Sequence, residues 1–305
     1  MAQRSREHRL TPNDAMFLYG ESDENMMHVA SLMRFKPPSE SDPQIKRDPH
    51  MLRDLVREVY AARQLEPPWN LSLKHPRFLR HPAPVWVEQD EVDAEYHVRR
   101  SALPSPGDER ELGVLVSRLH GIRIDFNRPA WETHLIEGLK GGEFALYTKM
   151  HHSLVDGFTA SKILARSFST DPYECTPLFF QQPVPPRGPS DGEPRSPWRR
   201  AAETAWTQLQ AAREVAGTAR ELGKALIQGD PEIAGGLVAP RSILNGRIGR
   251  NRRFATQQFD LAALKDLAHA AGGTLNDLVL AMCAGGLRRF LLDLGALPDK
   301  PLVAM

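Results

Sequence analysis

Apolar residues recur along this chain with two different periods. A spacing of i, i+3, i+4, i+7 predicts amphipathic helices over 51–65 and 108–120, whereas alternation of apolar and polar positions predicts strands over 131–138 and 143–150. A glycine pair, Gly141-Gly142, predicts the turn between these two strands. The helical spacing rests on Leu52, Leu55, Val56, Val59, Leu112, Leu115, Val116 and Leu119.

Shorter signals surround these elements. Thr11 followed by Pro12 and Asp14 is typical of a capped helix start in the stretch "LTPNDAMFLYG". A short strand is expected near Tyr96 and Val98, and a helix over 158–168.

A change in composition separates the two halves of the chain. Prolines crowd into 177–197, which predicts a linker, and a long Ala-rich helix is expected over 198–228. Beyond it, "RRFATQQF" (252–259) predicts a strand, and "DLAALKDLAHAAGG" a helix that begins after Asp260. Thr274 and Asp277 then form a capping-box pattern at the start of a strongly apolar helix over 275–294.

The composition narrows the class of protein. A length of 305 residues suits two domains, and a net charge of +1 gives no indication of nucleic-acid binding. Cys175 and Cys283 form no CxxC pair, which favours a reducing cytoplasm over a disulfide framework. The N-terminus lacks the apolar core of a signal peptide, and no stretch approaches the roughly 20 apolar residues of a membrane span. We expect a cytoplasmic protein that is soluble or peripheral to a membrane.

The stretch "KMHHSLVDGF" (149–158) is the strongest candidate for a catalytic or metal-binding site. It joins the end of a predicted strand to a predicted helix, and adjacent strand residues point to opposite faces. His151 and His152 should therefore not share one pocket, which argues against a metal site. Ser153 is not in a GxSxG elbow, so a serine hydrolase has no local support. A neutral imidazole with an ordinary pKa near 6.5 would suit general-base catalysis.

A structural interpretation competes with the catalytic one. The two histidines can be satisfied polar residues at a strand end, with Asp156 as a helix cap. In the catalytic interpretation, Asp156 orients the imidazole or pairs with an arginine, and Gly157 permits close approach of the backbone. Residue types alone leave both interpretations open.

The motif and its surroundings resemble a known family. His152-Ser-Leu-Val-Asp156-Gly157 matches the HxxxDG signature of CoA-dependent acyltransferases with a chloramphenicol acetyltransferase-like fold. "LTPNDAMFLYGES", "RPAWETHLIEGL", "KMHHSLVDGFTA", "RSILNGRIGRNRRFA" and "LNDLVLAMCAGGLRRFLLDLGALPDKPLVAM" together are similar to the bacterial wax ester synthase/diacylglycerol acyltransferase family, in its order and over nearly the whole chain.

The resemblance implies a role for each motif residue. His152 would be the general base that deprotonates a diacylglycerol or a long-chain alcohol for attack on a fatty acyl-CoA. His151 would be supporting, Asp156 would organise the site, and Gly157 would allow close approach. Acyl-CoA would be a co-substrate, with no cofactor and no metal.

Two further motifs carry candidate substrate-binding residues. The Pro-Leu-Trp motif of the family occurs here as Pro129-Ala130-Trp131, and Asn276 and Asp277 match a second motif. Trp131 also suits a core position, and the capping box is a complete structural explanation for Asp277. The resemblance nevertheless makes Trp131, Asn276 and Asp277 the candidate substrate-binding residues.

The fold implied is α/β, with two chloramphenicol acetyltransferase-like halves and a channel between them. The first half is expected over 1–176, the linker over 177–197, and the bridging helix with an incomplete second half over 198–305. The alternative function is a non-catalytic remnant or a lipid-associated partner of the same fold. A basic run (Arg241, Arg247, Arg250, Arg252, Arg253) would form a solvated face, or would meet CoA phosphates or the anionic surface of a membrane or lipid droplet.

Overall fold

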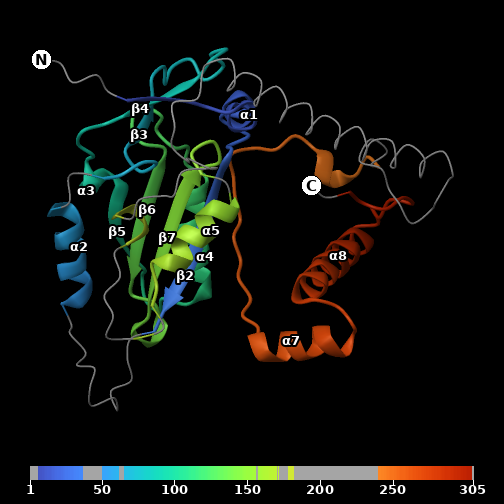
Figure 1. Ribbon diagram of the computed structural model, residues 1–305. Helices are drawn as coiled ribbons and strands as arrows, with labels where there is room; N and C mark the ends of the chain where they lie inside the picture. Colours follow the sequence, from blue (N-terminus) through green and yellow to red (C-terminus); the bar gives the residue numbers. More distant parts are fainter. Residues whose placement is uncertain are drawn as a thin grey trace, which may run out of the picture. The chain divides into compact units, whose positions relative to one another are not determined.

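A four-stranded sheet carries the histidine motif in the computed structural model of the chain (Figure 1). The structure describes residues 6–36, 50–61, 65–155, 157–169, 171, 178–181 and 240–303. The chain divides into one unit of Met1–Pro186 with Ile248–Gln257 and a second of Arg187–Arg247 with Gln258–Met305. Each unit is described by itself.

The main sheet has the strand order β2-β7-β6-β5. Its strands are β2 (His28–Phe35), β5 (Val98–Ala102), β6 (Trp131–Glu137) and β7 (Phe144–His151). β7 pairs antiparallel with β2 and β6, while β5 pairs parallel with β6. The register places His28 opposite His151, so the histidine motif emerges where β2 begins. A smaller antiparallel sheet has the order β1-β4-β3, from β1 (Glu7–Arg9), β3 (Leu71–Leu73) and β4 (Val85–Glu88).

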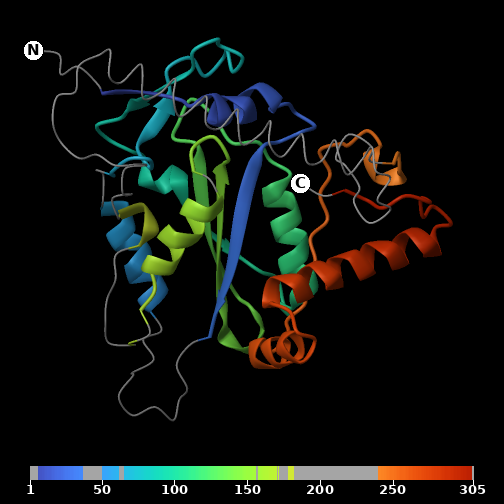
Figure 2. The same cartoon turned by 45° about the vertical axis from the view of Figure 1, so that its right-hand side comes forward.

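Helices cover both faces of the main sheet, as Figure 2 shows for α4 on one side and α5 with α2 on the other. In the first unit the helices are α1 (Pro12–Gly20), α2 (Met51–Ala61), α3 (Ala94–His97), α4 (Glu109–His120) and α5 (Gly157–Arg166). Short 3-10 turns are η1 (Lys140–Gly142), η2 (Phe179–Gln181) and, in the second unit, η4 (Ile243–Asn245). The second unit also contains α7 (Leu261–Ala270) and α8 (Leu275–Asp293).

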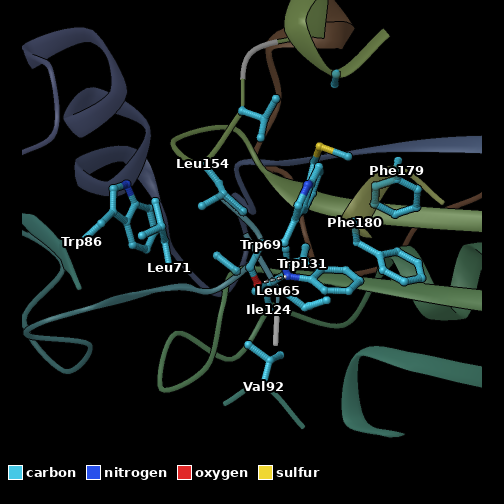
Figure 3. Packing of buried hydrophobic residues seen from close by; sticks show 14 of the residues in the cluster. Leu65, Trp69, Leu71, Trp86, Val92, Ile124, Trp131, Leu154, Phe179 and Phe180 are labelled. Carbon is cyan, nitrogen blue, oxygen red and sulfur yellow. Dashed lines mark hydrogen bonds between the residues drawn. The ribbon is translucent and has the colours of Figure 1, made fainter. Parts of the chain in front are cut away.

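The alternation of side chains along β7 explains how this strand contributes to two hydrophobic clusters. Ala145 and Tyr147 pack with the buried stripe of α4, whereas Met150 belongs to the cluster that includes Ala160 and Ile163 of α5. Successive side chains of a strand point to opposite faces, so one strand contributes to both. The larger cluster is rich in aromatic rings, and Figure 3 shows Trp131, Trp69 and Phe180 among its members.

The buried side chain of Lys149 joins β7 to the end of α4 by hydrogen bonds and to β6 by an ion pair. The Lys149 side chain is fully buried, and its Nζ donates to the carbonyl oxygens of Leu119 (2.9 Å) and Ile122 (2.7 Å). Its third partner is Oε1 of Glu132 at 2.5 Å. Burial favours the neutral form of Glu132, but His134 and Lys149 outweigh burial and lower its pKa to about 2. A cation at the carbonyl end of a helix also complements the helix dipole.

Most of the helices and strands predicted from the sequence pattern are present in the structure. The Thr11 side chain accepts from the Asp14 N–H (3.1 Å), and α4 begins after the N-cap Asp108. α8 opens with a complete capping box between Thr274 and Asp277. The strands over 131–138 and 143–150 correspond to β6 and β7, and the helix over 158–168 to α5.

One prediction of local structure is wrong in part, and one is wrong. The strand expected near Tyr96 and Val98 is present as β5 from Val98 onward, but Tyr96 lies in α3, because the Asp93 side chain caps a helical turn there. Residues 252–259 form no strand, because the neighbour of this segment in the first unit is the helix α4, which offers no ladder of backbone hydrogen bonds. The long helix over 198–228, most of the linker and Cys175 lie outside the described residues.

In the second unit, no single helix among the described residues has both the length and the apolar composition of a bilayer span. α7 and α8 meet those two criteria only as a pair bent by 93°. Cys283 on α8 is a free, exposed thiol.

Candidate active site

The two adjacent histidines at the end of β7 have different environments, as their alternation predicts. His151 points to the side of Glu21 and Phe126, whereas His152 stacks on Phe17 of α1. The backbone places them: the His151 N–H donates to the carbonyl oxygen of Ala130 (2.9 Å) and the His152 N–H to that of Met27 (3.0 Å). The two imidazoles therefore do not form one pocket.

The imidazole of His151 is enclosed and already engaged. Its side chain is 1% exposed. Nδ1 accepts from the Ser153 backbone N–H (3.2 Å) and lies 2.6 Å from the Ser153 hydroxyl. Because Nδ1 is an acceptor, the proton of the neutral ring is on Nε2, which lies 3.5 Å from Oε2 of Glu21. Burial lowers the pKa of His151, although Glu21 acts to raise it. This ring has no lone pair available for a substrate.

Glu21 is a buried carboxylate that joins three parts of the site. Oε2 accepts from the Met27 backbone N–H (2.6 Å), and Oε1 accepts from Nε of Arg123 (3.0 Å). Burial acts to raise its pKa, but His151, the Met27 N–H and Arg123 together lower it, so the carboxylate is ionised. Arg123 also pairs with Asp23 at 2.6 Å. The loop from Glu21 to Met27 is thus fixed against β7 and against Arg123 in the segment after α4.

His152 is the accessible member of the pair. Its side chain is partly exposed, and its ring lies flat on Phe17, with centroids 3.8 Å apart and an angle of 12° between the planes. Nδ1 is enclosed and has no hydrogen-bond partner within the described part of the chain. Because this side chain is partly exposed, another molecule can reach its ring.

The residues after the histidines are only partly described. Asp156 lies outside the described residues, so its predicted organising role stays a prediction. Gly157 is the exposed first residue of α5, and a Cβ placed there would meet no atom within 4 Å. The expected close approach to Gly157 therefore has no counterpart among the described protein atoms.

Trp131 is a core residue, which corrects its assignment as a substrate contact. Its side chain is 1% exposed, and Nε1 donates to the carbonyl oxygen of Trp69 (2.8 Å). The indole stacks on His97 and on Phe180, at centroid distances of 4.6 and 5.4 Å. Because rings and backbone cover both faces, the indole has no surface left for a substrate (Figure 3).

Asn276 and Asp277 lie in the first turn of α8, in the second unit. Asp277 accepts from the Thr274 backbone N–H (2.8 Å) and hydroxyl (2.7 Å), as the capping box requires. Both residues are exposed, and their expected substrate contact stays a prediction.

Three site residues are not predicted from sequence as functional. Phe17 and Glu21 lie in the quoted stretch "LTPNDAMFLYGES", which carries the family resemblance, but nothing in its spacing points to His151 or His152. Arg123 lies in no quoted motif. Among the described residues, no group of three or more His, Cys, Asp or Glu side chains is arranged to hold a metal ion.

Comparison with known proteins places this geometry in a family. The wax ester synthase/diacylglycerol acyltransferase catalytic domain matches residues 10–279. A Mycobacterium tuberculosis (strain H37Rv) protein with the provisional name diacylglycerol O-acyltransferase is 48% identical over 333 aligned positions, which cover 100% of this chain and 65% of that protein. The O-acyltransferase WSD of Acinetobacter baylyi is 34% identical over 97% of this chain and 62% of its own length.

A solved structure agrees with these sequence matches. The wax ester synthase/diacylglycerol acyltransferase from Marinobacter aquaeolei VT8 matches with a TM-score of 0.70 and 36% identity, over 97% of this chain and 64% of that one. The mixed α/β class is therefore confirmed. The chain spans a little less than two thirds of the length of each of these relatives.

Proposed function

Because the chain belongs to the wax ester synthase/diacylglycerol acyltransferase family, we propose that it transfers a fatty acyl group from acyl-CoA to a hydroxyl, with His152 as general base. The imidazole of His152 takes the proton of the hydroxyl as its oxygen attacks the thioester carbonyl carbon. The carbon–sulfur bond then breaks, and the imidazolium returns the proton to the CoA thiolate. The products are an ester and free CoA, and the base is regenerated.

The difference between the two histidines carries this proposal. His151 has its Nδ1 occupied by Ser153 and its Nε2 directed at Glu21, inside the protein. His152 is partly exposed and stacks on a ring that takes no proton from it. A general base must present a free lone pair to its substrate, and only His152 of this pair meets that condition.

We propose diacylglycerol or a long-chain alcohol as the acceptor. Support comes from the names of the relatives, which are called a diacylglycerol O-acyltransferase and a wax ester synthase/diacylglycerol acyltransferase. Fatty acyl-CoA is then the co-substrate, and no separate cofactor takes part in the balanced reaction.

Substrates of this kind reside at lipid surfaces, so we also propose that the protein is cytoplasmic and binds membranes or lipid droplets peripherally. Peripheral attachment by charge and shallow apolar contacts weakens in high salt. Carbonate or high salt should release the protein from membranes, and retention in the pellet would oppose this proposal.

A direct assay tests the reaction. The purified protein is incubated with palmitoyl-CoA, with and without hexadecanol or dioleoylglycerol, and both thiol release and ester formation are followed. The proposed function predicts thiol release that depends on the acceptor and equals the ester formed. Thiol release without ester, or neither product, would contradict it.

A further inference from the structure

A groove runs along the outer side of α4, in the first unit. It is formed between α4 and the segment of residues 250–256, and its volume is about 1030 Å³. The residues that line it are Glu109, Arg110, Gly113, Val114, Ser117, Arg118, Gly121, Ile122, Arg250, Asn251, Arg252, Arg253, Phe254, Ala255 and Thr256. None of the residues of the histidine motif, 149–158, lines this groove.

Specific contacts fix the two walls. The Thr256 hydroxyl donates to Oε2 of Glu109 (2.7 Å), and Arg252 donates to the carbonyl oxygen of Glu24 (3.2 Å). A Cβ at Gly113 would lie 2.8 Å from the carbonyl oxygen of Phe254, so a glycine is needed where the segment crosses the helix. The groove is therefore built by contacts at both of its ends and at Gly113.

The groove concentrates positive charge in a chain whose net charge is only +1. It has five arginines and one acidic residue, and the carboxylate of Glu109 is already paired with Arg34 and Thr256. Arg252 and Arg253 donate to backbone carbonyl oxygens. The other three arginines of the lining, Arg110, Arg118 and Arg250, have exposed side chains.

Apolar side chains lie among these arginines. Val114 is 64% exposed, Ile122 is 51% exposed and Phe254 is 37% exposed. Large apolar residues that stay exposed inside a groove are typical of a ligand surface. A ligand that suits this lining carries several negative charges and a flat or aliphatic apolar part.

One end of the groove is connected to the candidate active site. Ile122 of the groove precedes Arg123, which donates a hydrogen bond to Glu21. Arg252 of the groove donates a hydrogen bond to the carbonyl oxygen of Glu24. Glu21 and Glu24 belong to the loop that ends at Met27, whose carbonyl oxygen accepts from the His152 N–H. The loop that holds the histidine motif thus also borders the groove.

We propose that this groove binds the phosphate-bearing nucleotide end of acyl-CoA, which rests on the proposed function. The exposed arginines contact the phosphates, since guanidinium groups form strong charge-assisted hydrogen bonds with phosphate oxygens. Phe254, Val114 and Ile122 contact the adenine and the pantetheine arm. A groove with two walls fits a slender ligand better than the flat surface of a bilayer, which would also offer phosphates.

Binding of adenosine 3′,5′-bisphosphate, measured by calorimetry on the whole chain, tests this proposal. The double variant Arg118→Ala/Arg250→Ala should bind it about tenfold more weakly for each arginine removed. Arg77→Ala, an exposed arginine outside the groove, should bind like wild type. Affinity of the wild type should fall as salt rises, and adenosine without phosphates should bind weakly and equally to all three proteins.

Other outcomes would overturn the proposal and are distinct from failure of the proposed function. Unchanged bisphosphate affinity in the double variant would refute the proposal that the groove binds the nucleotide end of acyl-CoA, even if acyl transfer is robust. Arginine-dependent binding to phosphatidylglycerol vesicles, without any effect on the bisphosphate, would assign the groove to a lipid surface instead. If the protein bound the bisphosphate through these arginines but made no ester, the groove would still be assigned as a nucleotide-binding site, and the proposed acyl transfer would be rejected.

Discussion

The phenyl ring of Phe17 lies flat on the imidazole of His152, with ring centroids 3.8 Å apart and planes 12° from parallel. Phe17 comes from α1, which Thr11 caps and which buries Leu18 completely. A helix near the N-terminus thereby sets the orientation of a side chain at the end of β7. The stacked pair explains how His152 keeps one orientation without a described hydrogen bond to its ring.

Loss of this stacking should slow the reaction. Phe17→Leu keeps an apolar side chain but removes the flat face, so the imidazole can rotate away from the acceptor hydroxyl. Small misplacements of a reacting group cost up to about 100-fold in rate, and we expect a fall of about 10- to 100-fold in kcat. Phe17→Tyr keeps the face and should stay within a few-fold of wild type. Equal rates for Phe17→Leu and wild type, at equal melting temperatures, would show that the stacking has no role.

Glu21 should matter for stability far more than its neighbour Asp23. Glu21→Ala leaves the Met27 N–H and Arg123 without their buried partner, so we expect a loss of about 3 kcal/mol in the free energy of unfolding. Asp23 pairs with the same arginine, but its side chain is 68% exposed, and Asp23→Ala should cost below about 1 kcal/mol. Urea denaturation of both variants measures the difference. Similar losses would mean that the buried carboxylate has no special role.

Two helical glycines should respond in opposite ways to alanine. In an open helix position, Gly→Ala stabilises by up to about 1 kcal/mol. Gly285 of α8 has no atom within 4 Å of its Cβ position and should follow that rule. Gly113→Ala should instead destabilise, because its Cβ meets the Phe254 carbonyl oxygen at 2.8 Å and the backbone of the segment must move. Thermal unfolding of the two variants gives the signs, and a stabilised Gly113→Ala would refute the contact.

Mild acid should destabilise the fold through buried histidines. Burial lowers the pKa of both His28 and His97 to about 4. Their ordinary pKa is near 6.5, so the unfolded chain takes up protons first as pH falls. Their contribution to stability is therefore full above about pH 6.5 and is lost towards about pH 4. Between about pH 7 and pH 5, each histidine should account for about 2 kcal/mol.

A variant isolates one of these histidines. His97→Phe keeps an aromatic ring against Trp131 but cannot take up a proton. Its stability should fall less steeply between about pH 7 and pH 5 than that of the wild type, in denaturant titrations at each pH. An identical slope would show that His97 does not titrate in this range.

Local sequence patterns predict individual helices and strands, because capping and alternation are local. Thr274 with Asp277 and the alternation in β7 each specify their own element. β2 is not predicted: it is an edge strand of the main sheet, most of it is only partly buried, and its apolar alternation is weak. The segment 252–259 has strand-like residues, but it lies against a helix in the first unit.

The candidate site is predictable only where it is local. The opposite directions of His151 and His152 follow from strand geometry. Their partners do not, since Phe17 and Glu21 reach them through the tertiary packing of α1 and the loop after it. Trp131 shows the same limit: its residue type suits a core or a substrate contact, and only the surrounding rings decide for the core.

The central claim is that His152, and not His151, is the base. It is tested most directly by thiol release from palmitoyl-CoA with hexadecanol as acceptor, in wild type, His152→Ala and His151→Ala. We expect His152→Ala to lose about 10²- to 10⁴-fold in kcat while its melting temperature stays near that of the wild type. His151→Ala should melt at a lower temperature, because Glu21 and Ser153 lose their buried partner. Near-normal turnover in a folded His152→Ala protein would contradict the account.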